Sequence, residues 1–293
     1  MTSKKKYTLT KEKVKDTKAD IENRQAYIGG SDIGTIMGVN QWKSPYTLWA
    51  EKTGLITPED ISDVEAVWWG TNLEDLVAKR FTMKTGIAVR KSNFAYGCKE
   101  YPYLRGHVDR LGAKEKIGLE CKTTSSWNKC RYDEGVIPDQ HYWQCMFYIF
   151  LTGIDTWYLA TKRDSQFYVT KVTRDDEAIE RMLDACEDFW NHVQTGEPPE
   201  VDGSESTQET LDAIYPNSVE GDTVNLDKQE DTLLALLEIQ TQEKSLKEFK
   251  TKYQNEIKAV LGEHSRGETG QFIVTWRTNK NGSRRFELKE RAL

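Results

Sequence analysis

The sequence predicts an α/β domain built on a mixed β-sheet, followed by a helical extension. The order of the expected elements is the first observation: helices, a run of strands, one helix, two strands and one helix, which is typical of helices layered on a sheet. The second is composition, because 37% of the 293 residues are hydrophobic and 11% are aromatic, enough for a packed core. The third is a helical spacing of apolar residues that resumes after an acidic segment.

The N-terminal part of the chain is expected to hold a basic arm and three helices. Residues 1–18 contain seven lysines, which indicates a solvated and partly disordered arm over residues 1–20, with DNA contact as the alternative. Turn and capping residues indicate where the three helices begin. The first begins at Ser31, behind a Gly-Gly turn, and the second follows a loop through Ser44 and Pro45. The third begins at Gly70 and has Gly86 just past its end.

The sheet and two further helices are expected between residues 87 and 196. Alternating and β-branched segments predict strands over 87–96, 104–112, 117–124, 156–163 and 166–174. The helix expected over 139–153 is apolar nearly all round and should be buried, whereas the helix over 176–196 is amphipathic. We expect the whole domain to span residues 21–199.

The remaining residues are expected to form a linker and an extension. Residues 200–225 are acidic, rich in Ser and Thr and interrupted by Pro216, as in a linker. Residues 226–293 predict a long amphipathic helix that needs a partner, followed by a hairpin with Asn281 and Gly282 at its turn.

Cysteine spacing, hydropathy and charge exclude several classes of protein. Five widely spaced cysteines without a CxxC pair argue against a disulfide framework or a zinc ribbon, so free thiols are expected. No apolar run approaches the ~18 residues of a membrane span, and the first residues lack the core of a signal peptide, so we expect no membrane contact and a cytoplasmic location. The net charge of -6 gives no global sign of nucleic-acid binding, although it is uneven, since residues 197–245 hold thirteen acids against two lysines.

An unusual set of charges lies in the hairpin expected at the start of the sheet. Glu120 and Lys122 alternate with Leu119 and Cys121 along a strand, so the two charged side chains share a face. The hairpin can bring Asp109 beside Glu120 on that face. Two neighbouring carboxylates repel unless a cation lies between them, and oxygen ligands favour Mg²⁺ or Mn²⁺. Such an ion can coordinate a phosphate and activate water, with Lys122 beside that water.

A surface ladder of salt bridges is the alternative explanation for these charges. The flanking residues favour the metal site, because Gly106, Val108, Ile117 and Gly118 are apolar or small and indicate a central strand.

The spacing of Asp109, Glu120 and Lys122 resembles the D…(D/E)xK signature of the PD-(D/E)XK nucleases. The surrounding sequence is more specific, and it resembles the YqaJ-type viral recombinases, the family of phage lambda exonuclease. The segments that carry the resemblance occur in the expected order: YIGGSDIGTIMGVNQWKSPYTLWAEKTG, GTNLEDLVAKRF, GHVDR…GLECKTT and IPDQHYWQCMFYIFLTGIDTWYLA. The resemblance covers about residues 21–200 and implies a restriction-endonuclease-like α/β core.

The resemblance implies roles for the charged residues of this hairpin. Asp109 and Glu120 would hold the metal ions, the carbonyl of Cys121 would add a ligand, and Lys122 would serve the nucleophilic water.

Two helical residues are also implied in the site. Glu74 resembles the family's helical glutamate that completes the acidic cluster, and its alternative role is a capping box with Thr71. Gln144 resembles the glutamine on the helix after the catalytic strand, where an amide would hold water or a phosphate oxygen. Without such a role, Gln144 would be a buried amide in need of a partner.

The resemblance implies that Arg24 and Ser31 bind a terminal 5′ phosphate, because their spacing matches the family's pair. The expected helix N-terminus at Ser31 favours an anion, and the alternative is that Ser31 is only the N-cap. His107 precedes Asp109 by two residues and shares its strand face, so contact with a DNA phosphate is one option and a surface histidine the preferred one.

Three tryptophans, Trp42, Trp68 and Trp69, invite a base-stacking or strand-separating role, since an exonuclease must part the ends of its duplex. Aromatic residues near helices more often belong to the core, and we prefer that interpretation for these three and for Tyr148.

As a whole, the resemblance implies a phage-type recombination exonuclease that digests one strand of linear double-stranded DNA from its 5′ end, with two Mg²⁺ ions per site. It also implies a homo-oligomer, a trimeric ring around DNA, which passes its 3′-tailed product to a single-strand annealing protein. The alternatives are a PD-(D/E)XK endonuclease, a repair nuclease of other polarity, or a non-catalytic DNA-binding assembly subunit.

Overall fold

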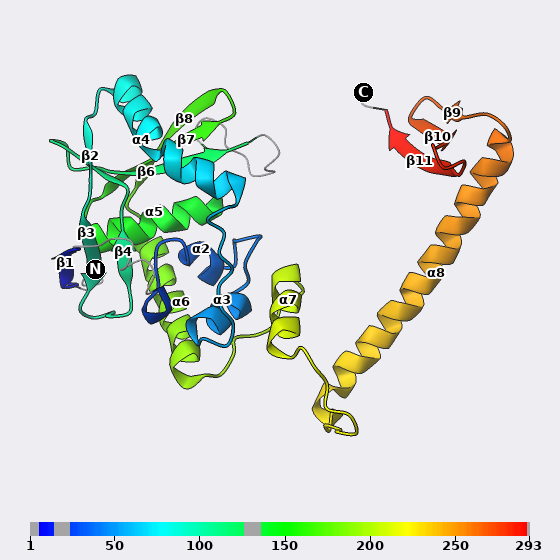
Figure 1. Cartoon of the computed structure of the whole chain (residues 1–293), viewed down its shortest axis with the longest axis horizontal. Helices are drawn as coiled ribbons and strands as arrows, with labels where there is room; N and C mark the ends of the chain where they lie inside the picture. Colours follow the sequence, from blue (N-terminus) through cyan, green and yellow to red (C-terminus); the bar gives the residue numbers. More distant parts are fainter. Residues whose placement is uncertain (1–5, 15–23, 126–135, 292–293) are drawn as a thin grey trace. The chain divides into compact units, whose positions relative to one another are not determined.

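A mixed five-stranded sheet organises the first of two units of the chain (Figure 1). The computed structural model describes residues 6–14, 24–125 and 136–291, which divide into a unit that ends at Ser218 and a unit that begins at Val219. The strands in spatial order are β2 (Val89–Lys91), β5 (Arg110–Gly112), β6 (Gly118–Thr124), β7 (Thr156–Arg163) and β8 (Gln166–Thr173). β6 and β7 are parallel and the other neighbours antiparallel, which confirms the predicted mixed α/β fold.

Two of the expected strands are each divided between this sheet and a second one. The segment 87–96 gives β2 and β3 (Phe94–Cys98), and the segment 104–112 gives β4 (Arg105–His107) and β5. β3 and β4 join β1 (Leu9–Lys13) in a three-stranded antiparallel sheet. The chain therefore crosses from one sheet to the other between β4 and β5, and Asp109 lies at this crossing.

Part of the predicted basic arm is an ordered strand, β1, although all five of its residues are exposed to solvent. This strand pairs with β3 from Leu9 opposite Cys98 to Lys13 opposite Phe94. The ammonium of Lys11 lies 4.0 Å from the centre of the Phe94 ring, a favourable cation–π distance. The other residues of the predicted arm, 1–5 and 15–20, lie outside the described residues.

Helices cover both faces of the five-stranded sheet (Figure 1). On one face, α4 (Glu65–Thr85) packs Val77 and Phe81 against Leu119 of β6. On the other face, α5 (Asp139–Thr152) shares a core cluster with Trp157 of β7. As predicted, α5 is buried nearly all round, and Gly86 ends α4 with a left-handed φ of 76°.

The remaining helices of the first unit frame one end of this core. They are η1 (Arg24–Ala26), α2 (Ile33–Ile36), α3 (Pro45–Lys52), α6 (Asp176–Thr195) and α7 (Glu205–Ile214). The hydroxyl of Ser44 caps α3 at the amide of Thr47, and Pro45, which was interpreted as part of a loop, is the first residue of this helix. α7 lies within the segment interpreted as a linker and joins α3 through a 2.8 Å hydrogen bond between the hydroxyls of Thr47 and Thr210.

The second unit consists of a long helix and a small sheet. α8 (Glu230–Leu261), preceded by η2 (Asp227–Gln229), confirms the predicted long helix. Three antiparallel strands follow and include the predicted hairpin: β9 (Arg266–Glu268), β10 (Phe272–Thr278) and β11 (Arg284–Glu290). Gly282 takes a left-handed φ of 78° in the turn. Within the described ranges, no helix has the length and apolarity to cross a bilayer.

Candidate active site

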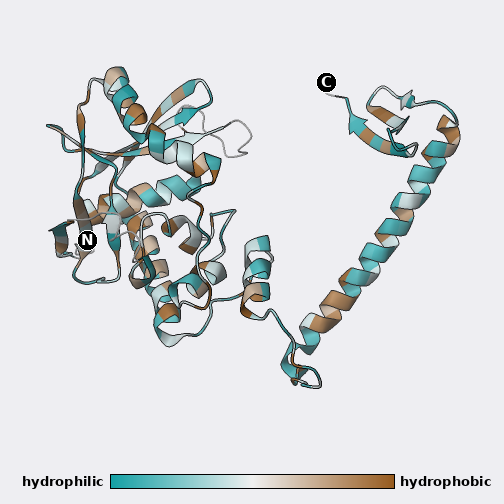
Figure 2. Cartoon of the chain, viewed as in Figure 1, coloured by the Kyte–Doolittle hydropathy of each residue, from teal (hydrophilic) through white to brown (hydrophobic). Residues whose placement is uncertain are grey.

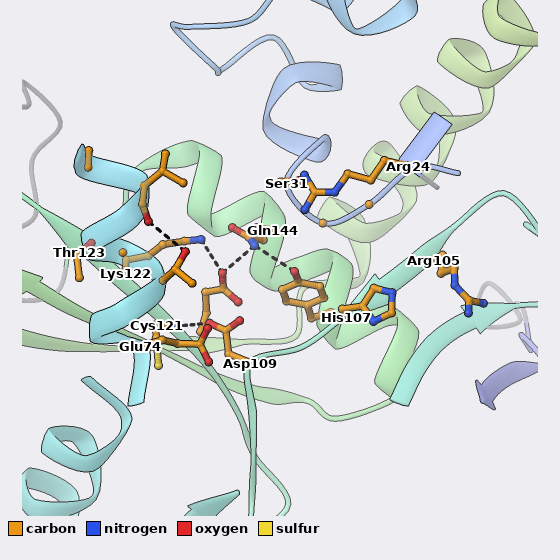
Figure 3. A pocket seen from close by; sticks show the side chains of 18 of the residues that line it. Arg24, Ser31, Glu74, Arg105, His107, Asp109, Cys121, Lys122, Thr123 and Gln144 are labelled. Carbon is orange, nitrogen blue, oxygen red and sulfur yellow. Dashed lines mark hydrogen bonds and ion pairs between the residues drawn. The ribbon is translucent and has the colours of Figure 1, made fainter. Parts of the chain in front are cut away.

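One pocket of the first unit gathers every residue to which the sequence assigned a catalytic, metal-binding or phosphate-binding role (Figure 3). These lining residues are Arg24, Ser31, Glu74, His107, Asp109, Glu120, Cys121, Lys122 and Gln144. They come from η1 and the following loop, α4, β4 and its crossing to β5, β6 and α5. Arg105, Thr123 and Tyr148 also line it and were not assigned a role.

The pairing of β5 with β6 explains how Asp109 comes next to Glu120. Arg110 lies opposite Leu119, so one further step along the antiparallel ladder places Asp109 opposite Glu120. Oδ2 of Asp109 accepts the backbone N–H of Cys121 at 2.8 Å, which fixes the carboxylate where the chain leaves the ladder. Two carboxylates are thus held on neighbouring strands, as the predicted hairpin required.

Glu120 is buried, with 2% of its surface exposed. Its Oε1 accepts hydrogen bonds from Nζ of Lys122 at 2.6 Å and from Nε2 of Gln144 at 2.8 Å. Figure 3 labels both donors and marks their interactions with dashed lines. Its Oε2 is buried and has no hydrogen-bond partner among the described residues. Because a buried carboxylate oxygen without a partner is costly, this atom is suited to a cation.

The charges next to Asp109 and Glu120 are unbalanced in favour of a further cation. Burial raises the pKa of Asp109 well above its ordinary value, and the negative charge of Glu120 raises it further. Burial acts to lower the pKa of Lys122, but the carboxylates of Glu120 and Asp109 outweigh it and raise that pKa above its ordinary value. Lys122 is therefore an ammonium at neutral pH, and one ammonium faces two carboxylates.

Gln144 connects this acidic pair to a buried tyrosine. Its Nε2 also donates to the hydroxyl of Tyr148 at 3.1 Å, so the buried amide has the partners that its position required. Burial, followed by the charge of Glu120, raises the pKa of Tyr148 well above its ordinary value, which keeps the phenol protonated. A Cβ at Gly30 would lie 2.5 Å from this hydroxyl oxygen, so only glycine leaves room for Tyr148 here.

Glu74 lines the pocket, but its carboxylate is engaged by an arginine. Oε1 of Glu74 accepts Nη1 of Arg110 at 2.5 Å, and the same guanidinium binds Asp75. The capping-box alternative is wrong, because Thr71 lies inside α4 and its hydroxyl donates to the carbonyl of Val67. Over the described residues, no group of three or more Asp, Glu, His or Cys side chains is close enough to hold an ion, so Asp109 and Glu120 form the candidate pair.

Arg24 and Ser31 lie in the same pocket, and Figure 3 shows Arg24 extending toward Ser31. The expected helix start at Ser31 is wrong, because α2 spans only Ile33–Ile36 and is preceded by Asp32 as N-cap. Ser31 is therefore not a cap, and the helix dipole does not explain an anion site here. A positive charge and a hydroxyl group are what these two residues supply.

Arg105 is the pocket residue that the sequence most clearly left unassigned. Arg105, His107 and Asp109 alternate along the chain and all line the pocket, while Gly106 and Val108 between them are buried. This alternation was the signal that could have identified Arg105. The same alternation places His107 in the wall of the pocket. The preferred interpretation of His107 as a surface histidine is therefore wrong.

A buried lysine fixes the loop that carries Arg24 and Ser31. The side chain of Lys52, at the end of α3, is 3% exposed. Its Nζ donates to the carbonyls of Arg24 and Tyr27 at 2.6 Å each and to Oδ2 of Asp32 at 2.8 Å. The same oxygen of Asp32 accepts the amide of Gly29 at 2.9 Å. The loop is therefore closed on a buried ion pair, a role of Lys52 and Asp32 that the sequence did not reveal.

The tryptophans expected in the core are exposed. Trp42, Trp68 and Trp69 have 72%, 48% and 49% of their surface accessible. Trp68 and Trp69 pack edge to face with ring centres 4.9 Å apart, next to Val67 and Gly70 in the pocket wall. For Trp68 and Trp69 the core interpretation failed because α4 begins early, and its residues are buried only from Val77 onward.

A mixed sheet that presents an aspartate, a glutamate and a lysine from adjoining strands is the fold of the PD-(D/E)XK nucleases. The sequence model of the YqaJ-like viral recombinase domain matches residues 21–155. The "Uncharacterized protein YqaJ" of Bacillus subtilis (strain 168) is 31% identical over 282 residues, which cover 94% of this chain and 88% of that protein. The chain belongs to the YqaJ-like viral recombinase family.

Solved structures of two exonucleases are similar to the chain at low sequence identity. The alkaline exonuclease LHK-Exo of Laribacter hongkongensis is 18% identical, with a TM-score of 0.50 over 61% of this chain and 94% of that one. A phage-related exonuclease from Haemophilus somnus 129PT is 14% identical, with a TM-score of 0.43 over 58% and 96% of the two chains. At 18% identity, the likeness to LHK-Exo concerns the fold alone.

Replacing Asp109 with Asn is expected to stabilise the protein when no divalent metal is present. The amide oxygen can still accept the Cys121 amide, while the charge that opposes Glu120 is removed. Because the folded-state pKa of Asp109 lies above its unfolded value, ionisation of this group opposes folding at neutral pH. We expect the apparent melting temperature in EDTA to rise by about 3 °C.

Asp75→Asn is the matched control for this measurement. A hydrogen bond from Lys91 lowers the pKa of Asp75, so its ionisation favours folding and its replacement should give no gain. A melting temperature that falls in Asp109→Asn, or rises equally in both variants, would contradict the repulsion between Asp109 and Glu120.

Replacing Lys52 with Met is expected to destabilise the first unit by about 3 kcal/mol, because Asp32 would keep a buried and unpaired charge. The control is Lys91→Met, which breaks a 3.1 Å pair with Asp75 whose side chains are 61% and 68% exposed, and it should cost about 1 kcal/mol or less. Urea unfolding followed by tryptophan fluorescence compares the two. Equal losses would mean that Lys52 does not hold the loop.

Proposed function

We propose that the chain is a metal-dependent exonuclease of phage-type recombination, which digests one strand of linear double-stranded DNA in the 5′-to-3′ direction and leaves a 3′ single-stranded tail. Membership of the YqaJ-like viral recombinase family supports the class. The observation that carries the chemistry is Oε2 of Glu120, a buried carboxylate oxygen with no hydrogen-bond partner among the described residues, beside the elevated pKa of Asp109.

Asp109 and Glu120 fit a hard divalent cation. They supply carboxylate oxygens on adjoining strands, and the carbonyl of Cys121 is the third proposed ligand, a set that suits Mg²⁺ or Mn²⁺. When bound, such an ion polarises a phosphate and lowers the pKa of a water molecule. Two ions per site are part of the proposal, and the second would require Glu74 to give up its contact with Arg110.

Lys122 acts in this proposal as a cation and not as a general base, since its raised pKa keeps the ammonium protonated. One hydrogen is donated to Oε1 of Glu120, and the others remain for a phosphate oxygen or for the attacking water. Gln144 holds the same Oε1 from the side of α5. Glu120 is thereby oriented before DNA arrives, which is the preorganisation that stabilises a transition state.

In this proposal, the polarity of digestion is determined by hydrogen-bond donors of the pocket that would bind the 5′ end of the DNA. Arg24, Ser31 and Arg105 offer guanidinium and hydroxyl donors that suit a terminal phosphate. A 5′ phosphate held by these groups would leave the next phosphodiester at Asp109 and Glu120. His107, in the wall between them, is proposed to contact the same strand.

The resemblance to the family supports the assembly that we propose for the active protein. It is a homo-oligomer, a trimeric ring that encloses linear double-stranded DNA and passes its product to a single-strand annealing protein. The net charge of -6 is compatible with this, since a ring can turn its lysines toward the DNA and its acids outward.

Glu120→Gln is expected to reduce digestion of linear duplex DNA in Mg²⁺ by about a thousandfold or more, because it removes the charge that faces the cation. Duplexes labelled at each 5′ end, incubated with Mg²⁺ or with EDTA, report activity, cofactor and polarity on one gel. Glu115→Gln, an exposed residue of the same hairpin, is the control and should digest normally. Normal digestion by Glu120→Gln would refute the catalytic role of the pocket.

A 5′-phosphorylated end is expected to be digested about tenfold to a hundredfold faster than a 5′-hydroxyl end, because a charged hydrogen bond contributes about 1.5 to 3 kcal/mol. Arg24→Met should lower the rate on the phosphorylated end to that on the hydroxyl end, and Arg90→Met, an exposed arginine outside the pocket, should preserve the difference. Equal rates in the unaltered protein would exclude the phosphate site. Loss from the 3′ end would assign the opposite polarity.

A further inference from the structure

The long helix α8 leaves an apolar stripe uncovered within the second unit. Ile239, Leu246, Tyr253 and Val260 recur every seven residues, and 52%, 67%, 58% and 85% of their surfaces are accessible. Phe249 lies on the same side of the helix and is 55% exposed. Figure 2 shows apolar segments recurring along α8 among hydrophilic ones. A lone helix in water gains little from such residues, so the stripe calls for a partner surface.

The small sheet of this unit packs on a different face of α8. Leu261 is buried beneath it, and the ammonium of Lys258 lies over the rings of Trp276 and Phe286 at 5.8 and 5.7 Å from their centres. Neither Lys258 nor Leu261 belongs to the seven-residue series. The sheet therefore leaves the stripe available.

The spacing of the stripe is that of a coiled coil. Ala235, Gln242, Phe249 and Glu256 fall between the members of the seven-residue series, so the alternating steps of three and four residues continue over 235–260. A shallow hollow lies on the stripe between its side chains, lined by Thr241, Gln242, Ser245, Leu246 and Phe249. Such hollows receive the side chains of a facing helix.

The charges of α8 determine which orientation of a second helix is favourable. Residues 230–243 contain four acids and no lysine or arginine, whereas residues 244–261 contain five lysines and two glutamates. A parallel pair would place acid against acid and base against base. An antiparallel pair places the acidic half of each helix against the basic half of the other.

We propose that α8 binds α8 of a second copy of this chain in antiparallel orientation through the stripe at 235–260. In the proposed register, each residue of the series 239, 246, 253 and 260 faces a residue of the series 235, 242, 249 and 256 in the second copy. Leu246 then packs against Phe249 of the second copy at the centre, and Gln242 packs against Tyr253 of the second copy. Glu243 then lies beside Lys250 of the second copy, and symmetry repeats this pair. An in-register parallel pair would instead bring Glu238 against Glu243. This interface is independent of the nuclease function proposed above.

The first test asks whether the stripe carries self-association of the full chain. Sedimentation velocity over a range of concentrations is expected to give half the assembled mass for Leu246→Asp/Phe249→Asp, because two charges would enter the interface. Thr251→Asp, on the opposite side of α8, is the control and should assemble like the unaltered chain. A mass that is the same in all three proteins, including a monomer throughout, would overturn the proposal.

The second test asks for the orientation. Glu243→Lys and Lys250→Glu should each weaken association about tenfold, because each replaces two attractive pairs by repulsive ones. The double variant Glu243→Lys/Lys250→Glu should regain the original affinity. In a parallel pair, Glu243→Lys would instead relieve the repulsion from Glu238 and strengthen association, and that result would overturn the antiparallel arrangement.

Discussion

The repulsion between two carboxylates on adjoining strands is the constraint on which the first unit depends. The register of β5 and β6 places Asp109 opposite Glu120, which is buried, while Asp109 is half-buried. Lys122 and Gln144 satisfy one oxygen of Glu120, and the other oxygen has no partner among the described residues. A fold selected only for stability would not keep such a pair, since buried charges without full compensation oppose folding. The cost is consistent with a site that is completed by a cation.

The rest of the pocket is arranged around this pair. The crossing of the chain between the two sheets lets one extended segment carry Arg105, His107 and Asp109 along the pocket wall. On the facing side, the ion pair of Lys52 with Asp32 closes the loop that carries the phosphate-binding candidates. Rigid elements therefore position both the group that would hold the end of the DNA and the group that would cleave it, which is the condition for directional digestion.

Much of this could be predicted from the sequence, because the decisive signals were local. The apolar character of α5 and the hairpin through Asp109 and Glu120 follow from spacing and turn chemistry, and both are present. What failed depended on contacts distant in sequence. Lys52 resembles any helix-terminal lysine until its three acceptors meet in space, and Trp68 is exposed because of where α4 begins. Arg105 was detectable by alternation alone, yet no motif marked it.

We propose that Asp109 and Glu120 bind a divalent cation through the oxygen of Glu120 that has no hydrogen-bond partner among the described residues. Anomalous diffraction from a crystal grown with Mn²⁺ tests this most directly, because the metal is located without any assay of activity. A manganese peak is expected between the two carboxylates, with Lys122 still bound to the other oxygen of Glu120. An ordered pocket without a peak at saturating Mn²⁺, or a peak held by other residues, would contradict it.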